Sequence, residues 1–338
     1  MTFIRKFDTL LHKSNKNIYK IDSEDGINLT IFNDGFKSLL SKKLYSGSFT
    51  FLDYWFDLDK DDNVYGIINN KEGSLLYYNI IDAYIIRSTL LKYNSDLRFI
   101  KFVYIKNENN HSDVFYYSID NKNPYCGLLI HHHRKNSKWQ TFIVDKISYN
   151  VLTNFIVIYD NAMNPTIFYY NLTNGFEELY ASAFSNDTNT WSAPLQISHS
   201  KKPKIYLSVI QDSRKCYHIL FSENNYSKYY CTYISGYINN NNFNYSNICV
   251  ISNTVACTFP NIIEYNNKLY ANWIEYHTLY YSYSKDYGLT WSQIAISNKS
   301  SADPFVCCNY HTNLISKNSL NYYTLFTKEN SIDILGIE

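Results

Sequence analysis

Three consecutive histidines, His131-His132-His133, are the residues whose type and spacing most directly suggest metal chemistry. On a β-strand, His131 and His133 would share one face, and two imidazoles so placed can chelate zinc or copper. The spacing of the other residues indicates no third ligand. Because the run falls where an outer hairpin is expected, we predict a solvated strand edge that opposes aggregation, with no bound metal and no cofactor.

Carboxylates would supply a second kind of chemistry, because a pair of them can hydrolyse a glycosidic bond. The candidates expected on or near inner strands are Asp53, Asp57, Asp160, Asp212, Glu264, Glu275 and Asp303. None belongs to a recognisable catalytic motif, so a surface or turn position is the expected role of each. Phosphate-binding glycine loops, nucleophile elbows and zinc-protease helices are missing from the sequence.

The elements that must position these residues are strands. The 338 residues include 35 Tyr and 20 Phe, which favour strands. Apolar residues recur with a period of two, as in NVYGIIN (63–69) and KIYLSVI (204–210), and polar clusters such as INNNNFN (238–244) separate such stretches. Long helical patterns are absent, and residues 2–12 fit a short amphipathic helix or a strand. The sequence therefore predicts an all-β protein.

The predicted strands recur as a unit. LYYSYSKDYGLTWSQIAIS (279–297) and LYASAFSNDTNTWSAPLQIS (179–198) both run from an apolar-aromatic strand through a polar turn to Thr-Trp-Ser and a strand ending in Ile-Ser. A weaker copy at 128–148 has Trp139 in the equivalent place. With one further hairpin before each copy, the unit is four antiparallel strands in about 45–55 residues, the length of a propeller blade.

We therefore predict a single β-propeller domain over residues 1–338. Its complete four-stranded antiparallel blades are expected at 48–92, 97–148, 152–198, 203–252 and 257–298. Residues 1–47 and 303–338 are expected to supply closing strands from both termini, which would hide the edges of the ring. The spacing favours seven blades, with six if the terminal strands merge; a β-sandwich or two stacked barrels is the alternative fold.

Residues 284–291, Ser-Lys-Asp-Tyr-Gly-Leu-Thr-Trp, have a composition suited to a tight turn. Asp286 can accept exposed backbone N–H groups, and Gly288 can take a positive φ. Thr290 can add a hydroxyl hydrogen bond, and Trp291 can bury its ring between neighbouring blades. All four roles concern folding.

This stretch resembles the Asp-box, or BNR repeat, of sialidases and other β-propellers, S-x-D-x-G-x-T-W, at every specified position from Ser284 onward. Asp187, Thr190 and Trp191 resemble a worn copy, in which Asn189 stands near the place of the glycine. In that family the box lies at the blade periphery, away from the active-site end. The resemblance therefore implies a structural role for these residues and no catalytic one.

The resemblance also implies what a sialidase would need, namely three arginines that clamp the substrate carboxylate and a Tyr nucleophile assisted by a Glu. The five arginines here are Arg5, Arg87, Arg98, Arg134 and Arg214. The Arg-Ile-Pro element of the family is matched only by Phe3-Ile4-Arg5-Lys6, which has no proline. Only Arg98 and Arg214 are expected near inner strands, so we predict a sialidase-like fold without the arginine triad.

The charge balance limits the partners. Lys and Arg number 31 and Asp and Glu 30, a net charge of +1, which argues against nucleic acid or an anionic membrane as the main partner. No run of apolar residues is long enough for a membrane-spanning helix. The N-terminal segment lacks the apolar core of a secretory signal, so a cytoplasmic location is expected, with a surface or spore layer as the alternative.

We expect a non-catalytic propeller that binds a protein or a glycan on one end face, since abundant Tyr and Asn suit adaptable recognition surfaces. The first alternative is a glycoside hydrolase of sialidase-like fold with acidic residues in the channel mouth. The second, suggested by the tyrosine content, is a structural component of a bacterial cell-surface or spore layer. Two carboxylates about 5–10 Å apart at the channel mouth would favour the enzyme.

Overall fold

The structure of the protein is a computed structural model. It describes residues 3–82, 84–108, 111–136, 138–253, 256–301, 304–314, 324–328 and 333–337, without the side chains of Arg5 and Ser301. Within these ranges the regular elements are β-strands and one short 3-10 turn, η1 (Asn298–Ser301), so the all-β prediction is confirmed. The segment that fitted either a helix or a strand forms β1 (Phe3–His12). No helix in the described part of the chain could span a membrane.

The chain divides into two compact units. Unit 1 comprises residues 1–5, 149–307 and 317–338, and unit 2 comprises residues 6–148 and 308–316. Apart from one seven-stranded sheet, the described strands form antiparallel sheets in which the strands follow one another in chain order. The sheets are consistent with a β-propeller, whereas the number of blades, the closed ring and the single domain stay predictions.

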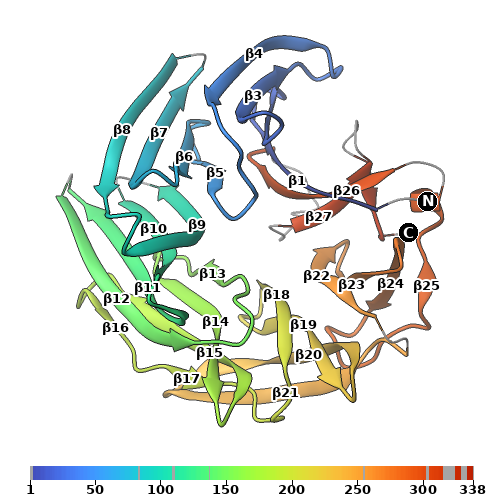
Figure 1. Cartoon of the computed structure of the whole chain (residues 1–338). Helices are drawn as coiled ribbons and strands as arrows, with labels where there is room; N and C mark the ends of the chain where they lie inside the picture. The colour runs from blue at the N-terminus through green and yellow to red at the C-terminus, as the bar shows by residue number, and fades with distance from the viewer. Residues whose placement is uncertain are drawn as a thin grey trace. The chain divides into compact units, whose positions relative to one another are not determined.

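Unit 2 contains two complete four-stranded sheets (Figure 1). The strands of the first are β5 (Tyr54–Leu58), β6 (Val64–Asn69), β7 (Ser74–Ile81) and β8 (Tyr84–Lys92). Those of the second are β9 (Arg98–Glu108), β10 (His111–Asp120), β11 (Asn123–Lys135) and β12 (Lys138–Ser148).

Unit 1 contains three sheets. The strands of the first are β13 (Ile156–Tyr159), β14 (Pro165–Thr173), β15 (Phe176–Ser185), β16 (Thr190–Trp191) and β17 (Leu195–Gln196). Those of the second are β18 (Lys204–Gln211), β19 (Tyr217–Asn225), β20 (Lys228–Asn239) and β21 (Asn242–Val250). Those of the third are β22 (Thr258–Tyr265), β23 (Lys268–Glu275), β24 (Thr278–Ser284) and β25 (Ala295–Ile296).

A seven-stranded sheet includes strands from both ends of the chain. Its order is β28-β27-β26-β1-β2-β3-β4. The additional strands are β2 (Ile18–Asp22), β3 (Ile27–Phe32), β4 (Ser38–Tyr45), β26 (Phe305–Thr312), β27 (Thr324–Lys328) and β28 (Ile334–Leu335).

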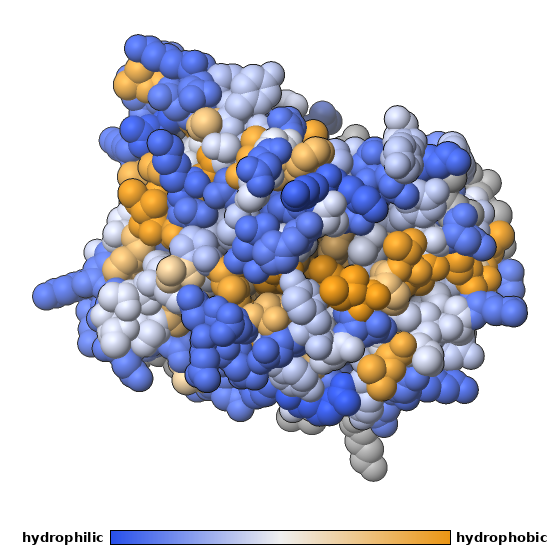
Figure 2. All heavy atoms as spheres, turned by 90° about the horizontal axis from the view of Figure 1, so that it is seen from below, coloured by the Kyte–Doolittle hydropathy of each residue, from blue (hydrophilic) through white to orange (hydrophobic). Residues whose placement is uncertain are grey.

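The strands differ in burial according to their position in a sheet. Second and third strands are buried almost throughout, as in β6 and β10, because other layers cover both of their faces. Fourth strands such as β8 are mostly exposed, and their remaining positions are only partly buried. Apolar side chains remain on the surface: Figure 2 shows a face on which hydrophobic residues lie in several groups between hydrophilic ones. The hydrophobic core of each unit therefore lies between its successive sheets.

Three first strands contain a bulge at an aromatic residue. Phe102 in β9, Tyr206 in β18 and Phe259 in β22 have φ values of 55°, 56° and 49°. At each place the register against the next strand shifts. A positive φ is uncommon for a bulky side chain, and bulges change the direction in which neighbouring side chains point. The bulge at Phe102 determines the geometry of the candidate site.

Candidate functional site

The first strands of the two complete sheets of unit 2, β5 and β9, lie side by side. Three pairs of side chains connect them, and we call these six residues the β5–β9 ladder. The pairs are Asp53–Lys101, Trp55–Tyr104 and Asp57–Lys106. The two outer pairs are ion pairs with N–O distances of 3.0 Å and 2.9 Å, and the middle pair is aromatic with ring centroids 5.0 Å apart.

The bulge aligns the three pairs. Asp53, Trp55 and Asp57 are spaced by two, so they share one face of an extended chain. Their partners at 101, 104 and 106 are not spaced by two throughout. The additional residue at Phe102 changes the alternation of β9 and places Lys101 on the same face as the two later partners.

Asp57 is, with Asp53, one of the two deeply buried carboxylates of the ladder. Its side chain is 1% exposed, and its carboxylate contacts both Lys106 Nζ, at 2.9 Å, and Nδ1 of His311 from β26, at 2.8 Å. Burial alone would raise the pKa of this carboxyl, but Lys106 and His311 together lower it to about 2. Asp57 is therefore ionised at neutral pH and its charge is balanced within unit 2.

Asp53 is held in the same way at the other end of the ladder. Its carboxylate pairs with Lys71 at 2.9 Å as well as with Lys101, and it accepts hydrogen bonds from the backbone and hydroxyl of Thr50. Burial opposes the charged form, yet the two lysines and Thr50 lower the pKa of this carboxyl. The ladder is thus a fixed array of balanced charges around an aromatic pair.

Trp55 offers the accessible surface of the ladder. Its ring is partly exposed and contacts Tyr104 and, edge to face at 5.9 Å, the imidazole of His311. Its indole Nε1 is buried, and no hydrogen-bond partner for it is found in the described part of the chain. A partly exposed aromatic ring between polar side chains can take a ligand that has both apolar surface and hydroxyl groups.

The histidine run is buried, so the predicted solvated edge is wrong. His131, His132 and His133 are 0%, 7% and 1% exposed. They lie within β11, a strand of 13 residues that is paired with β10 on one side and β12 on the other. Because β11 extends further than expected, the run occupies a paired strand instead of an outer turn.

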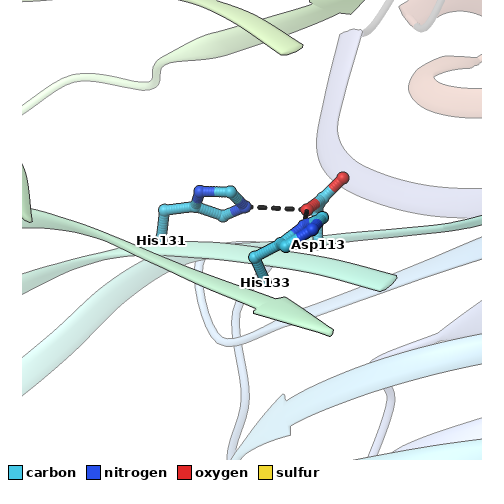
Figure 3. A group of neighbouring side chains, drawn as sticks. All are labelled: Asp113, His131 and His133. Carbon is cyan, nitrogen blue, oxygen red and sulfur yellow. Dashed lines mark hydrogen bonds and ion pairs between the residues drawn. The ribbon is translucent and has the colours of Figure 1, made fainter. Parts of the chain in front are cut away.

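Alternation divides the histidines between two faces. His131 Nε2 and His133 Nδ1 each lie 2.7 Å from Oδ1 of Asp113 on β10, and Figure 3 shows both rings directed at this carboxylate. His132 points to the other face, where Tyr116 and Thr141 form hydrogen bonds with it at 2.7 Å and 2.8 Å. The third polar group of this cluster is Asp113, which comes from the neighbouring strand β10. The spacing of residues in the sequence did not indicate it.

Most of the other acidic candidates have structural contacts. Asp160 and Asp212 each accept backbone N–H groups from residues two and four positions later, as Asx turns do. Asp212 also pairs with Arg214 and His218. Glu275 is buried, accepts a hydrogen bond from Trp273 at 2.6 Å, and has a pKa raised by burial. Glu264 is half-buried on β22, and Asp303 lies outside the described residues.

The turn at 284–291 has a compact set of hydrogen bonds. Asp286 accepts from the Thr290 hydroxyl at 2.5 Å, from the Thr290 backbone at 2.9 Å and from the Ser284 hydroxyl at 2.7 Å. Gly288 has φ 85°, and a Cβ there would lie 1.9 Å from the Tyr233 hydroxyl. Trp291 packs perpendicular to Tyr233 at 5.0 Å, in a cluster from two sheets of unit 1.

The worn copy lacks these interactions. Asp187 is exposed and has no hydrogen bond in the described part of unit 1. Thr190 shares a hydrogen bond with the Thr188 hydroxyl, and Asn189 takes the positive φ of 53°. Trp191 packs on Phe184 at 5.3 Å. The Asp-box resemblance of either turn stays a prediction.

Of the arginines, Arg87, Arg98 and Arg134 lie on three different strands of unit 2. Arg134 packs over the rings of Tyr77 and Trp139. In unit 1, Arg214 pairs with Asp212 and covers Tyr287 at 3.5 Å. The side chain of Arg5 lies outside the described part. Arg134 and Arg214 are thus engaged in contacts of their own.

The sequence predicts Asp53 and Asp57 as candidates but does not predict their partners. The alternation Asp-x-Trp-x-Asp at 53–57 was an available signal for one face of a strand. Lys106 and His311 could not be predicted from it, because they come from strands distant in the sequence.

No family model and no curated protein matches this chain. Solved structures do. An ulvan lyase of polysaccharide lyase family PL25 has a TM-score of 0.63 at 9% identity, covering 99% of this chain and 93% of its own. The polysaccharide lyase Uly1 has 0.57 at 9%, covering 98% and 88%. The WD40 domain of SCAP from fission yeast has 0.50 at 10%, covering 97% and 74%. At these identities the similarity shows a shared fold, and WD40 domains are β-propellers.

Proposed function

We propose that this protein binds a polysaccharide through the β5–β9 ladder. The observation that carries the proposal is the partly exposed Trp55 ring, which packs on the buried Tyr104 and is fixed between two ion pairs. A sugar ring has an apolar face that can pack on an aromatic ring and hydroxyl groups that accept or donate hydrogen bonds. The ladder offers the Trp55 ring to the apolar face, and the partly exposed Lys101 and Lys106 on either side of it can donate hydrogen bonds to hydroxyl groups.

The comparisons support the same class of ligand. Two of the structures that share the fold over nearly the whole chain are named as polysaccharide lyases, one of them as an ulvan lyase. The fold alone does not assign a function, so the weight of the proposal rests on the ladder. The alternative ligand of a binding module is a protein. A chain that binds no glycan would favour this alternative.

Catalysis on a polysaccharide is the second candidate function. It is favoured by His311, whose Nδ1 lies 2.8 Å from the ionised Asp57. A carboxylate that orients an imidazole and stabilises its charged form is a common arrangement for general acid–base catalysis. In this alternative Trp55 and Tyr104 would hold the chain and His311 would move the proton.

Binding is tested first with a glycan array that includes ulvan, and then by calorimetry with the best ligand. We expect Trp55→Ala to weaken binding at least about tenfold, because truncated aromatic anchors typically cost more than 1 kcal/mol. The matched control is Trp139→Ala, since Trp139 is also an accessible tryptophan of unit 2 but lies on the fourth strand of its sheet, β12, where it packs on Arg134 and Tyr77. Equal affinities of wild type and Trp55→Ala, or no glycan bound at all, would reject the proposal.

The same ligand separates binding from catalysis. An enzyme would release new reducing ends, together with a conjugated double bond if it is a lyase, and His311→Ala would abolish this release while Trp55 still holds the ligand. Stable binding without any product supports the binding module.

We also propose that the sheets close into a ring of seven blades, with six as the alternative. Support comes from the seven-stranded sheet, which contains strands from both ends of the chain and would count as two blades, β1–β4 and β26–β28. An experimental structure tests this directly. Small-angle scattering that fits an elongated particle would reject the ring.

A further inference from the structure

We propose that Asp113, His131 and His133 form a structural zinc site, with His111 as its fourth ligand. The first three residues each offer one ligand atom, and these atoms all lie within 4.8 Å of one another. Histidine nitrogen and carboxylate oxygen are both common zinc ligands, and zinc prefers four ligands in structural sites. The proposal departs from the metal-free protein expected from the sequence.

Two paired strands fix the three ligands. Asp113 on β10 lies directly opposite His133 on β11 in the antiparallel register, and His131 is two positions before His133 on the same face. His131 is further oriented by Phe115, whose ring stacks on it at 4.3 Å with an interplanar angle of 3°. The donors are therefore placed by the sheet and need no loop to order them.

Burial makes the site suitable for a structural ion. The side chains of Asp113, His131 and His133 are 3%, 0% and 1% exposed. A carboxylate and two imidazoles of this burial are costly unless they are paired, and a divalent cation would be the strongest partner available to them. Hydrogen bonds alone, at 2.7 Å from each imidazole to Asp113, are the competing explanation.

His111 is the second observation that points to a metal. It lies two residues before Asp113, hence on the same face of β10, and its ring centroid is 5.6 Å from that of His133. Its Nδ1 is buried without a hydrogen-bond partner in the described part of the chain. His111 is not among the three residues whose ligand atoms lie within 4.8 Å of one another, so its ring would turn toward them to bring this unsatisfied nitrogen into a tetrahedral set.

The site would support the β5–β9 ladder. Asp113 lies opposite Lys106 of the ladder in the register of β9 and β10, and Phe115 lies opposite Tyr104. An ion that holds β10 and β11 together would therefore fix the strand against which the ladder residues rest. This role is independent of whether the ladder binds a polysaccharide.

The first experiment measures metal in the untagged 338-residue chain. The protein is expressed in zinc-supplemented medium, dialysed against metal-free buffer, and analysed for zinc by mass spectrometry. We expect about one zinc ion per chain and a fall in Tm when a strong chelator is added. Cobalt exchanged for zinc should give the visible absorption of a tetrahedral site. Wild-type protein without zinc, whose Tm no chelator changes, would overturn the proposal.

Variants connect the metal to these residues. We expect Asp113→Asn and His131→Gln to reduce zinc affinity at least about 100-fold, since changes even in outer-shell partners cost 10–100-fold. His111→Ala should reduce it by about tenfold or more and alter the cobalt spectrum. Circular dichroism verifies that each variant is folded. If a variant does not fold, the zinc affinity of the wild-type protein is measured instead, by competition with a chromogenic chelator.

The matched control is His132→Gln. His132 is also buried and hydrogen-bonded, but it faces the opposite side of β11. We expect this variant to lose stability and to keep its zinc. Zinc that is lost equally from His132→Gln, or kept equally by Asp113→Asn, would overturn the site.

Discussion

Asp57 in unit 2 and Asp286 in unit 1 both have carboxyl pKa values of about 2, but the causes differ. Asp286 lies at the surface, and its pKa is lowered by hydrogen bonds from the side chain and backbone of Thr290 and from Ser284. Asp57 is buried, and its pKa is lowered by the charges of Lys106 and His311.

The two carboxylates differ in where their partners come from, and this difference limits what each carboxylate can do. Every donor to Asp286 lies within four residues of it, so the turn needs only its own segment to form. The partners of Asp57 come from β9 and β26, so its environment exists only when distant strands are assembled. A carboxylate with only local partners, such as Asp286, stabilises a turn. A carboxylate whose partners come from distant strands, such as Asp57, can bring charged, aromatic and imidazole groups together at one place.

Removal of Asp57 should have the largest effect on stability. Asp57→Ala leaves Lys106 and His311 without their buried counter-charge, and breaking a buried pair in this way costs about 3–5 kcal/mol. Asp286→Ala, which removes local hydrogen bonds only, should cost far less. Unfolding in urea, followed by fluorescence, measures both. Equal free energies of unfolding for the two variants would break the comparison.

The next largest effect on stability is expected at Gly288, in the turn at 284–291. Gly288→Ala should cost about 3 kcal/mol or more, because a left-handed alanine costs about 1–2 kcal/mol and its Cβ would also collide with the Tyr233 hydroxyl. Tyr233 cannot move freely, since it is buried and hydrogen-bonded to His218 at 2.6 Å.

Gly175→Ala is the matched control, with φ 84° and no atom within 4 Å of the added Cβ. It should cost only the conformational part, about 1–2 kcal/mol. Thermal unfolding of both variants gives the difference. If the two glycines cost the same, the turn at 284–291 is not tightly packed against Tyr233.

The stability contributed by Asp57 should depend on pH in the acidic range. The pKa of Asp57 in the folded state, about 2, is below its usual value, so the unfolded chain binds the proton more tightly. Its stabilisation is complete above about pH 4 and is lost as the pH falls through about 2. The difference in unfolding free energy between wild type and Asp57→Asn should therefore narrow by roughly 2 kcal/mol between these values. A difference that does not vary with pH contradicts the ionic role of Asp57.

The smallest effect distinguishes the two similar turns. Asp286→Ala should cost about 1 kcal/mol, the usual value for a carboxylate that caps a turn. Asp187→Ala should change stability by less than about 0.5 kcal/mol, because Asp187 is exposed and has no hydrogen bond in the described structure. Denaturant midpoints compare the two. A cost at Asp187 equal to that at Asp286 would mean that the worn turn is as well formed as the complete one.

The same distinction explains what could be predicted from the sequence. Alternation in stretches such as 63–69 and 204–210 predicted strands, and the all-β fold follows from it. The sequence predicts a solvated edge for the histidine run, because the length of β11 has no local signal. Its acidic partner Asp113 was missed because cross-strand register depends on the whole hairpin. The contacts of Asp57 were missed for the same reason.

The bulge at Phe102 also has a consequence for how this gene can change. Deleting that one codon would leave every ladder residue present, yet Lys101 would turn to the opposite face of β9 and Asp53 would lose one of its two lysines. A search for related sequences should therefore weigh the number of residues between Lys101 and Tyr104 as heavily as their identities. A gap of one there would mark a protein whose recognition surface has been rearranged.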